Sequence, residues 1–347
     1  MRTRRSQSSS DPVSETPSTL DGAKHQSVLL HETIDALAIL RSDIVVDATL
    51  GGAGHAREMV EKLGPGGLFI GFDLDSDAID RAQVALKDLP PEVILFKANF
   101  RTLRSELTKS GVEKIDKILF DLGWSAYQLD AGRGFSFSSR GGSASGGQKD
   151  EDLMMTYSKD PSQLTAATIV NEWEESSIAD VIYGWGEERY ARRIAKRIVE
   201  QRDQKRFTTA RELGEVVRDA VPAAYRRGRL HPATKTFQAL RIAVNDELGA
   251  LKEGLLGARE MLSSGGRIAV ITFHSIEDRL VKRTFADWER EKWGIRVTKK
   301  PLTPSVEEIR SNPRARSAKL RVFERNSISY EKTVTKNKQI QTLSASG

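Results

Sequence analysis

Five short, continuously apolar runs constrain the fold of this chain more than any other feature. They are rich in Ile, Val, Leu and Phe and cover 43–50, 66–73, 92–99, 114–123 and 265–275. Such runs are typical of strands that are buried on both faces of a sheet. Segments with helical spacing separate the first four runs. This alternation predicts an α/β fold with a mainly parallel, doubly wound sheet that helices cover on both faces.

The alternation stops after residue 123, and a long helical region precedes the fifth run. In 160–173, Asp160 has the position of a helix cap and Pro161 that of the first helical residue. Thr209 and Glu212 have the spacing of a capping box. The stretch 234–262 has the pattern of one long helix that leads into the fifth strand. We therefore expect an all-helical domain inserted into the α/β domain.

These patterns divide the chain into domains and tails. The α/β domain is expected at 23–129 and 234–326, with the inserted helical domain at 130–233 between them. Residues 138–149 are rich in Gly and Ser and are expected to form a flexible loop. The polar tails at 1–22 and 327–347 are expected to be disordered, because they have too few large apolar residues to offset the entropy of ordering.

The composition excludes several classes of site. The chain has no cysteine, which rules out disulfides, thiolate metal sites and cysteine nucleophiles. Its five histidines do not have the spacing of a metal site. Its apolar runs are shorter than the ~18 residues that a membrane span needs. We therefore expect a cytoplasmic protein with neither a metal nor a membrane partner.

Positive charge is concentrated in the helical region. Residues 186–241 contain 15 Lys/Arg against 7 Asp/Glu, while the whole chain has a net charge of +6. Such a region is typical of a protein that binds a phosphate backbone, although a solvated helix face gives the same pattern. The candidate backbone contacts lie along one predicted helix and are Arg189, Arg192, Arg193, Lys196 and Arg197.

Glycine, acidic and aromatic residues follow the ends of the first four predicted strands. They are Gly51, Gly52 and Gly54, then Asp73, then Asn99 and Phe100, and finally Asp121. The carboxyl ends of parallel strands are where doubly wound sheets bind ligands. Glycines let a backbone approach a ligand closely, Asp73 suits two ribose hydroxyls, and Phe100 suits stacking on a base. The pattern therefore predicts a nucleoside-containing ligand.

The spacing of the glycines favours S-adenosylmethionine over a dinucleotide. A dinucleotide fingerprint that began at Gly51 or Gly52 would need glycine in place of Ala56 or Arg57. The carboxylate of Asp47 would repel a pyrophosphate and would tolerate a sulfonium. A methyltransferase is therefore favoured over a nicotinamide dehydrogenase. An RNA-binding or ribosome-assembly protein on a degenerate methyltransferase fold is a further alternative, against which the intact glycine turn argues.

The absence of cysteine also limits the methyl acceptor. Methylation at carbon 5 of a pyrimidine ordinarily needs a cysteine that adds to the ring, whereas an exocyclic amine needs only placement and a hydrogen-bond acceptor. Asp121 has the position of that acceptor, although it equally suits a ligand of the cofactor. Trp124 and Tyr127 are available to stack on a base that has left its helix.

Seven blocks of the sequence, in order, resemble a single family. They are DATLGGAGHA, FDLGWSAYQLD, GRGFSF, GEERYARRIAKRIVE, HPATKTFQALRIAVNDEL, GGRIAVITFHSIEDRLVKR and NPRARSAKLRVFER. From about 24 to 325 the chain resembles the MraW-type bacterial 16S ribosomal RNA cytosine-N4 methyltransferases. The resemblance implies a class I, Rossmann-like methyltransferase with S-adenosylmethionine as cofactor. Its substrate would be the N4 amine of a cytidine in the decoding region (P site) of 16S rRNA, in the small ribosomal subunit.

The resemblance also implies individual site residues. The cofactor contacts carried over by motif are Ala53, Gly54, His55, Asp73, Phe100, Asp121 and Gln128. Further candidates for contact with RNA or the target base are Lys235, Gln238, Arg241 and His274, of which His274 has a helix cap as its alternative role. Two positions depart from the family pattern. Trp124 puts bulk beside the presumed target base, and Met154 stands where an arginine is expected. A monomer and a homodimer both stay open.

Overall fold

The computed structural model describes residues 27–123, 132–136, 150–157 and 162–327. Several predictions of the sequence analysis lie outside these residues. They are the roles of Trp124, Tyr127 and Gln128, the loop at 138–149, the helix cap at Asp160, and the tails at 1–22 and beyond 327. None of the described helices is long and apolar enough to cross a membrane.

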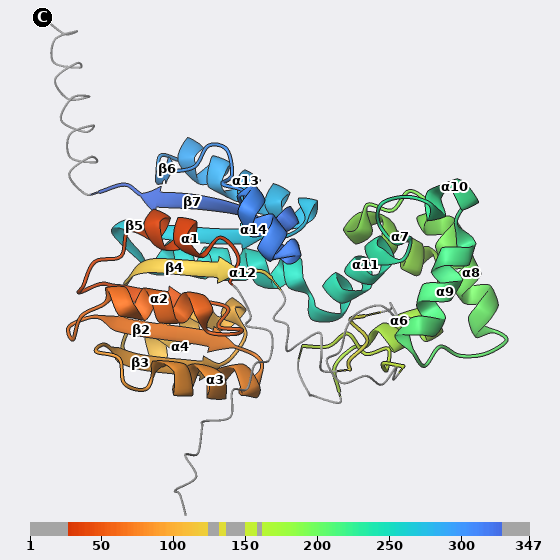
Figure 1. Ribbon diagram of the computed structural model, residues 1–347, viewed down its shortest axis with the longest axis horizontal. Helices are drawn as coiled ribbons and strands as arrows, with labels where there is room; N and C mark the ends of the chain where they lie inside the picture. Colours follow the sequence, from red (N-terminus) through yellow and green to blue (C-terminus); the bar gives the residue numbers. More distant parts are fainter. Residues whose placement is uncertain (1–26, 124–131, 137–149, 158–161, 328–347) are drawn as a thin grey trace, which may run out of the picture.

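A seven-stranded sheet forms the larger half of the molecule (Figure 1), with the strand order β3-β2-β1-β4-β5-β7-β6. The first five strands are parallel and are β1 Ile44–Asp47, β2 Leu68–Asp73, β3 Glu92–Lys97, β4 Ile115–Asp121 and β5 Leu262–Thr272. They lie within or close to the predicted runs. The predicted α/β fold with a mainly parallel, doubly wound sheet is confirmed.

Two C-terminal strands extend the sheet beyond β5 and were not predicted. β7 (Lys319–Arg325) pairs antiparallel with β5, and β6 (Gly294–Arg296) pairs antiparallel with β7 at the edge of the sheet. Thr272, the last residue of β5, lies opposite Lys319, the first residue of β7. The segment before β7 therefore reaches the sheet at the edge where the parallel strands end.

Alternate residues of the strands fill two hydrophobic cores, one on each face of the sheet. Val45 belongs to one core and its neighbour Val46 to the other. The Val45 core packs against α1 Leu30–Leu37, α2 Gly54–Lys62, α3 Ser76–Leu86 and the 3₁₀ turn η2 Pro313–Ser317. The Val46 core packs against α4 Leu103–Lys109, α12 Glu247–Met261 and α13 Ser275–Arg290. The short helix α14 (Val306–Ser311) precedes η2.

A group of helices with its own hydrophobic core forms the second half of the molecule, the helical cluster (Figure 1). Its helices are α6 Ala166–Glu172, α7 Glu175–Gly186, α8 Ala191–Arg202, α9 Ala210–Ala220, α10 Ala223–Arg226 and α11 Thr234–Asn245. The predicted start of α6 was wrong. The helix begins at Ala166, after four non-helical residues, and the side chain of Thr165 accepts a hydrogen bond from the Thr168 amide. Thr165 is therefore the N-cap of α6.

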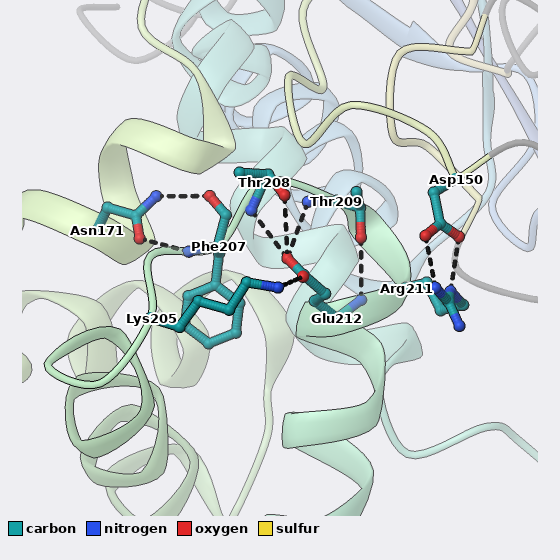
Figure 2. Close-up of polar contacts among 8 residues, drawn as sticks. All are labelled: Asp150, Asn171, Lys205, Phe207, Thr208, Thr209, Arg211 and Glu212. Atoms are coloured by element: carbon teal, nitrogen blue, oxygen red, sulfur yellow. Dashed lines mark hydrogen bonds and ion pairs between the residues drawn. The ribbon is translucent and has the colours of Figure 1, made fainter.

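The predicted capping box of α9 is confirmed and belongs to a larger polar network (Figure 2). The Thr209 hydroxyl accepts from the Glu212 amide at 3.3 Å, and the Glu212 carboxylate accepts from the amides of Thr208 and Thr209. Arg211 donates two bonds of 2.6 Å to Asp150. These contacts join the start of α9 to the segment at 150–157, which pairs with it through a bridge between Asp152 and Thr209.

The expected long helix at 234–262 is two helices, because the chain turns at Asp246. This residue has a left-handed φ of 46°, ends α11 and precedes α12. The side chain of Asn245 accepts from the Tyr157 amide at 2.9 Å and donates to the Met155 carbonyl at 2.8 Å. These contacts fix the turn. Helix α11 packs into the core of the helical cluster. The expected domain boundary between 233 and 234 stays a prediction.

Candidate functional site

Three carboxylates meet at the carboxyl ends of neighbouring parallel strands. Asp47 ends β1, Asp73 ends β2 and Asp121 ends β4. Asp47 is almost completely buried, and burial is the main reason that its pKa rises to about 7, with the nearby charges of Asp121 and Asp73 raising it further. Removing a carboxylate from water disfavours its charged form, and like charges add to that cost. This edge of the sheet is therefore strongly electronegative and suits a cationic ligand.

The glycine turn after β1 is held in place by Asp73. The Asp73 carboxylate accepts from the Gly51 amide and from the Asp75 amide, both at 2.9 Å. Gly51 and Ala53 have left-handed φ values of 49° and 61°. Such a backbone favours glycine, so Ala53 is strained. Burial raises the pKa of Asp73 above its usual value. The predicted ribose ligand is thus also the residue that shapes the turn.

Gly54 opens α2 and is contacted by a segment that the sequence analysis did not connect with the site. A Cβ atom at this position would lie only 2.1 Å from the Ser27 Oγ. Ser27 therefore lies against the start of α2, and a side chain at position 54 would require the Ser27 hydroxyl to turn away. Sequence spacing could not have revealed this contact, because Ser27 lies outside the glycine motif.

His55 joins the same segment to Asp121. Its Nε2 lies 3.1 Å from the Val28 carbonyl, and its Nδ1 lies 3.5 Å from Asp121 Oδ2. A carbonyl only accepts hydrogen bonds, so Nε2 carries a hydrogen. Burial is the main cause of the lowered pKa of His55. His55, predicted from the family motif, and Asp121, predicted from its place after β4, are thus brought together.

Thr49 orders the end of β4 and was not among the predicted site residues. Its hydroxyl accepts from the Asp121 amide at 2.7 Å, and its own amide donates to Asp47 Oδ1 at 3.0 Å. Asp121 Oδ1 in turn accepts from the Gly123 amide at 3.1 Å. The position of Thr49 between Asp47 and the glycines is the only signal in the sequence that could have indicated this role.

Phe100 lies after β3 as predicted, and its ring packs toward the protein interior. The ring meets that of Phe120 edge to face at 5.5 Å. A Cβ atom on Gly254 of α12 would lie 2.7 Å from Phe100 Cδ2, so α12 crosses close to the ring. The predicted contact of Phe100 with a base stays a prediction.

The substrate candidates of α11 make contacts within the protein. Lys235 Nζ donates to the Glu187 carbonyl, and Gln238 Nε2 donates to the Trp185 carbonyl. Arg241 is buried and forms an ion pair of 2.6 Å with Glu247. The structure thus places Arg241 in the joint between the two halves, and its predicted contact with RNA or the target base stays a prediction. The predicted roles of Lys235 and Gln238 stay predictions.

His274 is the N-cap of α13, the simpler of its two expected roles. Its Nδ1 accepts from the Glu277 amide at 3.4 Å, and its Nε2 lies 2.9 Å from Glu277 Oε1. Within the described residues, Glu247, His274 and Glu277 are the one group whose ligand atoms are close enough to hold a metal. The ion pair with Arg241 and the capping box of α13 already occupy all three of these side chains.

The cationic residues of α8 lie on its solvent face. Ile194 and Ile198 are fully buried, while Arg192, Arg193 and Lys196 are exposed. Arg197 forms an ion pair of 3.2 Å with Glu200 within the same helix. The helix is therefore amphipathic, with its apolar face in the core of the helical cluster.

Arg189 precedes α8 and is fixed by aromatic rings. Its guanidinium lies 4.8 Å from the ring centre of Tyr190 and 5.2 Å from that of Tyr225. A guanidinium above an aromatic face keeps its charge and its outward hydrogen-bond donors. Arg189 is thereby oriented at the end of the basic face.

Comparison with known proteins agrees with this site. The sequence model of the MraW methylase family matches residues 22–326. The ribosomal RNA small subunit methyltransferase H of Brevibacillus brevis (strain 47) is 43% identical over 317 residues, covering 87% of this chain and 98% of the relative. The enzyme of the same name from Paenibacillus sp. (strain JDR-2) is 44% identical over 325 residues, covering 87% and 99%. Because the match extends over most of the sequence, this chain belongs to the MraW methylase family.

Proposed function

We propose that this protein transfers a methyl group from S-adenosylmethionine to the exocyclic N4 amine of a cytidine in 16S ribosomal RNA, in the decoding region (P site) of the small subunit. The observation that carries the proposal is the cluster of Asp47, Asp73 and Asp121 around the glycine turn. Family membership and relatives named for small-subunit ribosomal RNA support it. Such a substrate agrees with a cytoplasmic enzyme.

The acidic cluster fits the charges of the cofactor. S-adenosylmethionine carries a sulfonium and an ammonium group, and when bound it supplies an activated methyl group. Asp73 binds the two ribose hydroxyls, while the backbone of Ala53, Gly54 and His55 lies against the amino-acid part. Phe100 and Gln128 contact the remainder of the cofactor, as the family motif implies. The nearby negative charge of Asp47 stabilises the cationic ligand.

Asp121 accepts the hydrogen of the target amine. Methyl transfer forms a bond between N4 and the methyl carbon, breaks the bond from that carbon to sulfur, and releases one proton from N4. The Gly123 amide donates to Oδ1 of Asp121, and His55 lies beside Oδ2. A fixed acceptor draws the amine lone pair out of conjugation and receives the proton. Trp124 and Tyr127 stack on the flipped base.

The exposed face of α8 binds the phosphate backbone of the RNA. Its candidates are Arg189, Arg192, Arg193, Lys196 and Arg197. Lys235, Gln238 and His274 lie on the elements between α8 and the sheet and complete the substrate side. Phosphate contacts contribute affinity and orientation but carry no sequence information. The choice of cytidine therefore depends on the residues around Asp121.

The test is methyl transfer to small subunits that lack the modification. The protein is incubated with labelled S-adenosylmethionine and these subunits, or with free 16S ribosomal RNA, and the RNA is digested to nucleosides. We expect label in N4-methylcytidine and in no other nucleoside. Absence of label from that nucleoside with both substrates contradicts the proposal, and binding without transfer would favour the RNA-binding alternative.

Two variants test the site in the same assay. Asp73→Ala should raise the dissociation constant for S-adenosylmethionine, because it removes the ribose acceptor and releases the Gly51 amide. Lys62→Ala is the control, since Lys62 ends α2 at the opposite edge of the sheet from the glycine turn. Equal cofactor affinity in both variants would contradict the assignment of Asp73.

A further inference from the structure

One motif of the sequence, the arginine-containing segment before β7, has no part in the site described so far. Pro313–Ser317 forms the 3₁₀ turn η2, in which Arg314 and Arg316 are exposed. Ala315 between them is fully buried and belongs to the core under α1 and α2. Ala318 is buried in the same core. The two small residues hold the backbone against the sheet, so both arginines face solvent.

The topology places these arginines at the ligand-binding edge of the sheet. Lys319, directly after the turn, lies opposite Thr272 at the carboxyl end of β5. Ile271 of the same strand lies opposite Asp121. Figure 1 shows α14 and the adjoining segment at the end of the sheet that faces the helical cluster. The arginines therefore lie on the sheet half of the molecule, next to the proposed site, whereas α8 belongs to the helical cluster and lies on its side away from the sheet (Figure 1).

Hydrogen bonds connect this segment to the glycine turn. Glu308 of α14 accepts from the Leu29 amide at 2.7 Å. The neighbouring Val28 carbonyl contacts His55 Nε2, and His55 Nδ1 faces Asp121. Leu29, Val28 and His55 therefore link α14 to Asp121, the proposed acceptor. Asn312 is both the last capping residue of α14 and the first of η2, so the position of α14 also fixes the position of the two arginines.

We propose that Arg314 and Arg316 bind phosphates of the RNA substrate on the catalytic half of the enzyme. The proposal deepens the proposed function and rests on it. Two exposed guanidiniums on a rigid turn suit phosphate groups, because the planar fork of arginine donates in pairs to anionic oxygens. The nearest carboxylate on the same segment, Glu308, is already used by the Leu29 amide. The RNA would be held from two sides, by α8 and by η2, with the target nucleotide between them.

The test compares the Arg314→Ala/Arg316→Ala protein with a control that loses the same charge. The control is Lys62→Ala/Arg290→Ala. Both residues are exposed, and each is the last residue of a helix, α2 or α13, that begins at the site. They therefore lie at the helix ends that point away from the site. Binding of each protein to unmodified small subunits is measured by filter binding over a range of salt concentrations. Cofactor affinity is measured alongside, and methyl transfer gives KM and kcat.

We expect the arginine variant to bind subunits at least about tenfold more weakly at low salt. The slope of its log affinity against log salt concentration should be shallower by the amount expected for the loss of about two phosphate contacts. Its KM for subunits should rise, while cofactor affinity stays that of the parent protein. The control should match the parent protein in all these quantities. Unchanged subunit affinity and salt slope in the arginine variant would overturn the proposal. Since binding is measured directly, a parent protein that binds but transfers no methyl to cytidine N4 would contradict the proposed function alone.

Discussion

Asp47→Asn should stabilise the protein, and increasingly so as the pH rises toward 7. The pKa of Asp47 rises from 3.8 to about 7 in the folded protein, mainly through burial. The pKa of Asp47 is higher in the folded protein than in the unfolded chain. The stability that protonated Asp47 contributes is therefore fully present below pH 3.8 and is lost as the pH rises from 3.8 to about 7. At 1.36 kcal/mol per pH unit, ionisation costs about 4 kcal/mol. Asparagine avoids that cost and can still accept from the Thr49 amide.

Urea unfolding without cofactor at pH 5, 6, 7 and 8 measures this effect. The free energy of unfolding of the variant minus that of the parent protein should grow by about 1.4 kcal/mol per pH unit up to pH 7 and then level off. Asp80→Asn is the control, because the same chemical change at an exposed site of α3 should leave the difference independent of pH. A pH-independent difference for Asp47→Asn, or a variant less stable than the parent at pH 8, would refute the reasoning.

Three further changes test other parts of the structure. Asp121→Asn should lower kcat about 100-fold at saturating cofactor, through loss of the acceptor; full turnover in that assay would leave Asp121 as a cofactor ligand only. Glu247→Ala should cost about 3–5 kcal/mol in urea unfolding, because it leaves the buried Arg241 guanidinium without its carboxylate; a loss below about 1 kcal/mol would contradict a structural role for the pair. Thr209→Ala should cost about 1 kcal/mol and Thr209→Ser much less, since only alanine removes the helix cap; equal thermal stability of the two variants would be inconsistent with the capping box.

β1, β2 and β4 could be predicted because residues on both of their faces are buried, and β3 could be predicted from its apolar sequence although it is only half-buried. A strand such as β2, with four buried residues in succession, leaves a short, continuous apolar run in the sequence. The edge of the sheet leaves a weaker signal. β6 has only three residues, and one of them, Ile295, is 52% exposed. The C-terminal strands therefore depend on the pairing of β7 with β5 and of β6 with β7, which sequence periodicity does not record.

The break at Asp246 could not be predicted for a different reason. The apolar spacing continues from α11 into α12, so local pattern favours one helix. The turn is fixed by partners far along the chain, through Asn245 with Met155 and Tyr157. The burial of Arg241 follows from the same turn, and a long cationic side chain on a helix is ordinarily expected at the surface. Contacts between segments that are distant in the sequence therefore underlie both the turn at Asp246 and the burial of Arg241.

The carboxylate cluster could be predicted from the sequence only in part. Parallel topology alone predicts that residues after successive strands converge, so Asp73 and Asp121 could be found from their positions. The contacts of His55 with Val28 and Asp121 involve three separate segments. Thr49 could be placed near the site but not assigned its bond to the Asp121 amide.

The insertion of the helical cluster between β4 and β5 has a consequence for synthesis of the chain. A ribosome completes β1–β4 first, then all the helices of the cluster, and only afterwards β5, the strand that pairs with β4. Until β5 emerges, β4 is an unpaired edge, the kind of surface that promotes aggregation. The cluster has its own core and can fold during that interval. Chains that terminate near residue 245 should therefore contain folded helices beside an open sheet and depend on chaperones to stay monomeric.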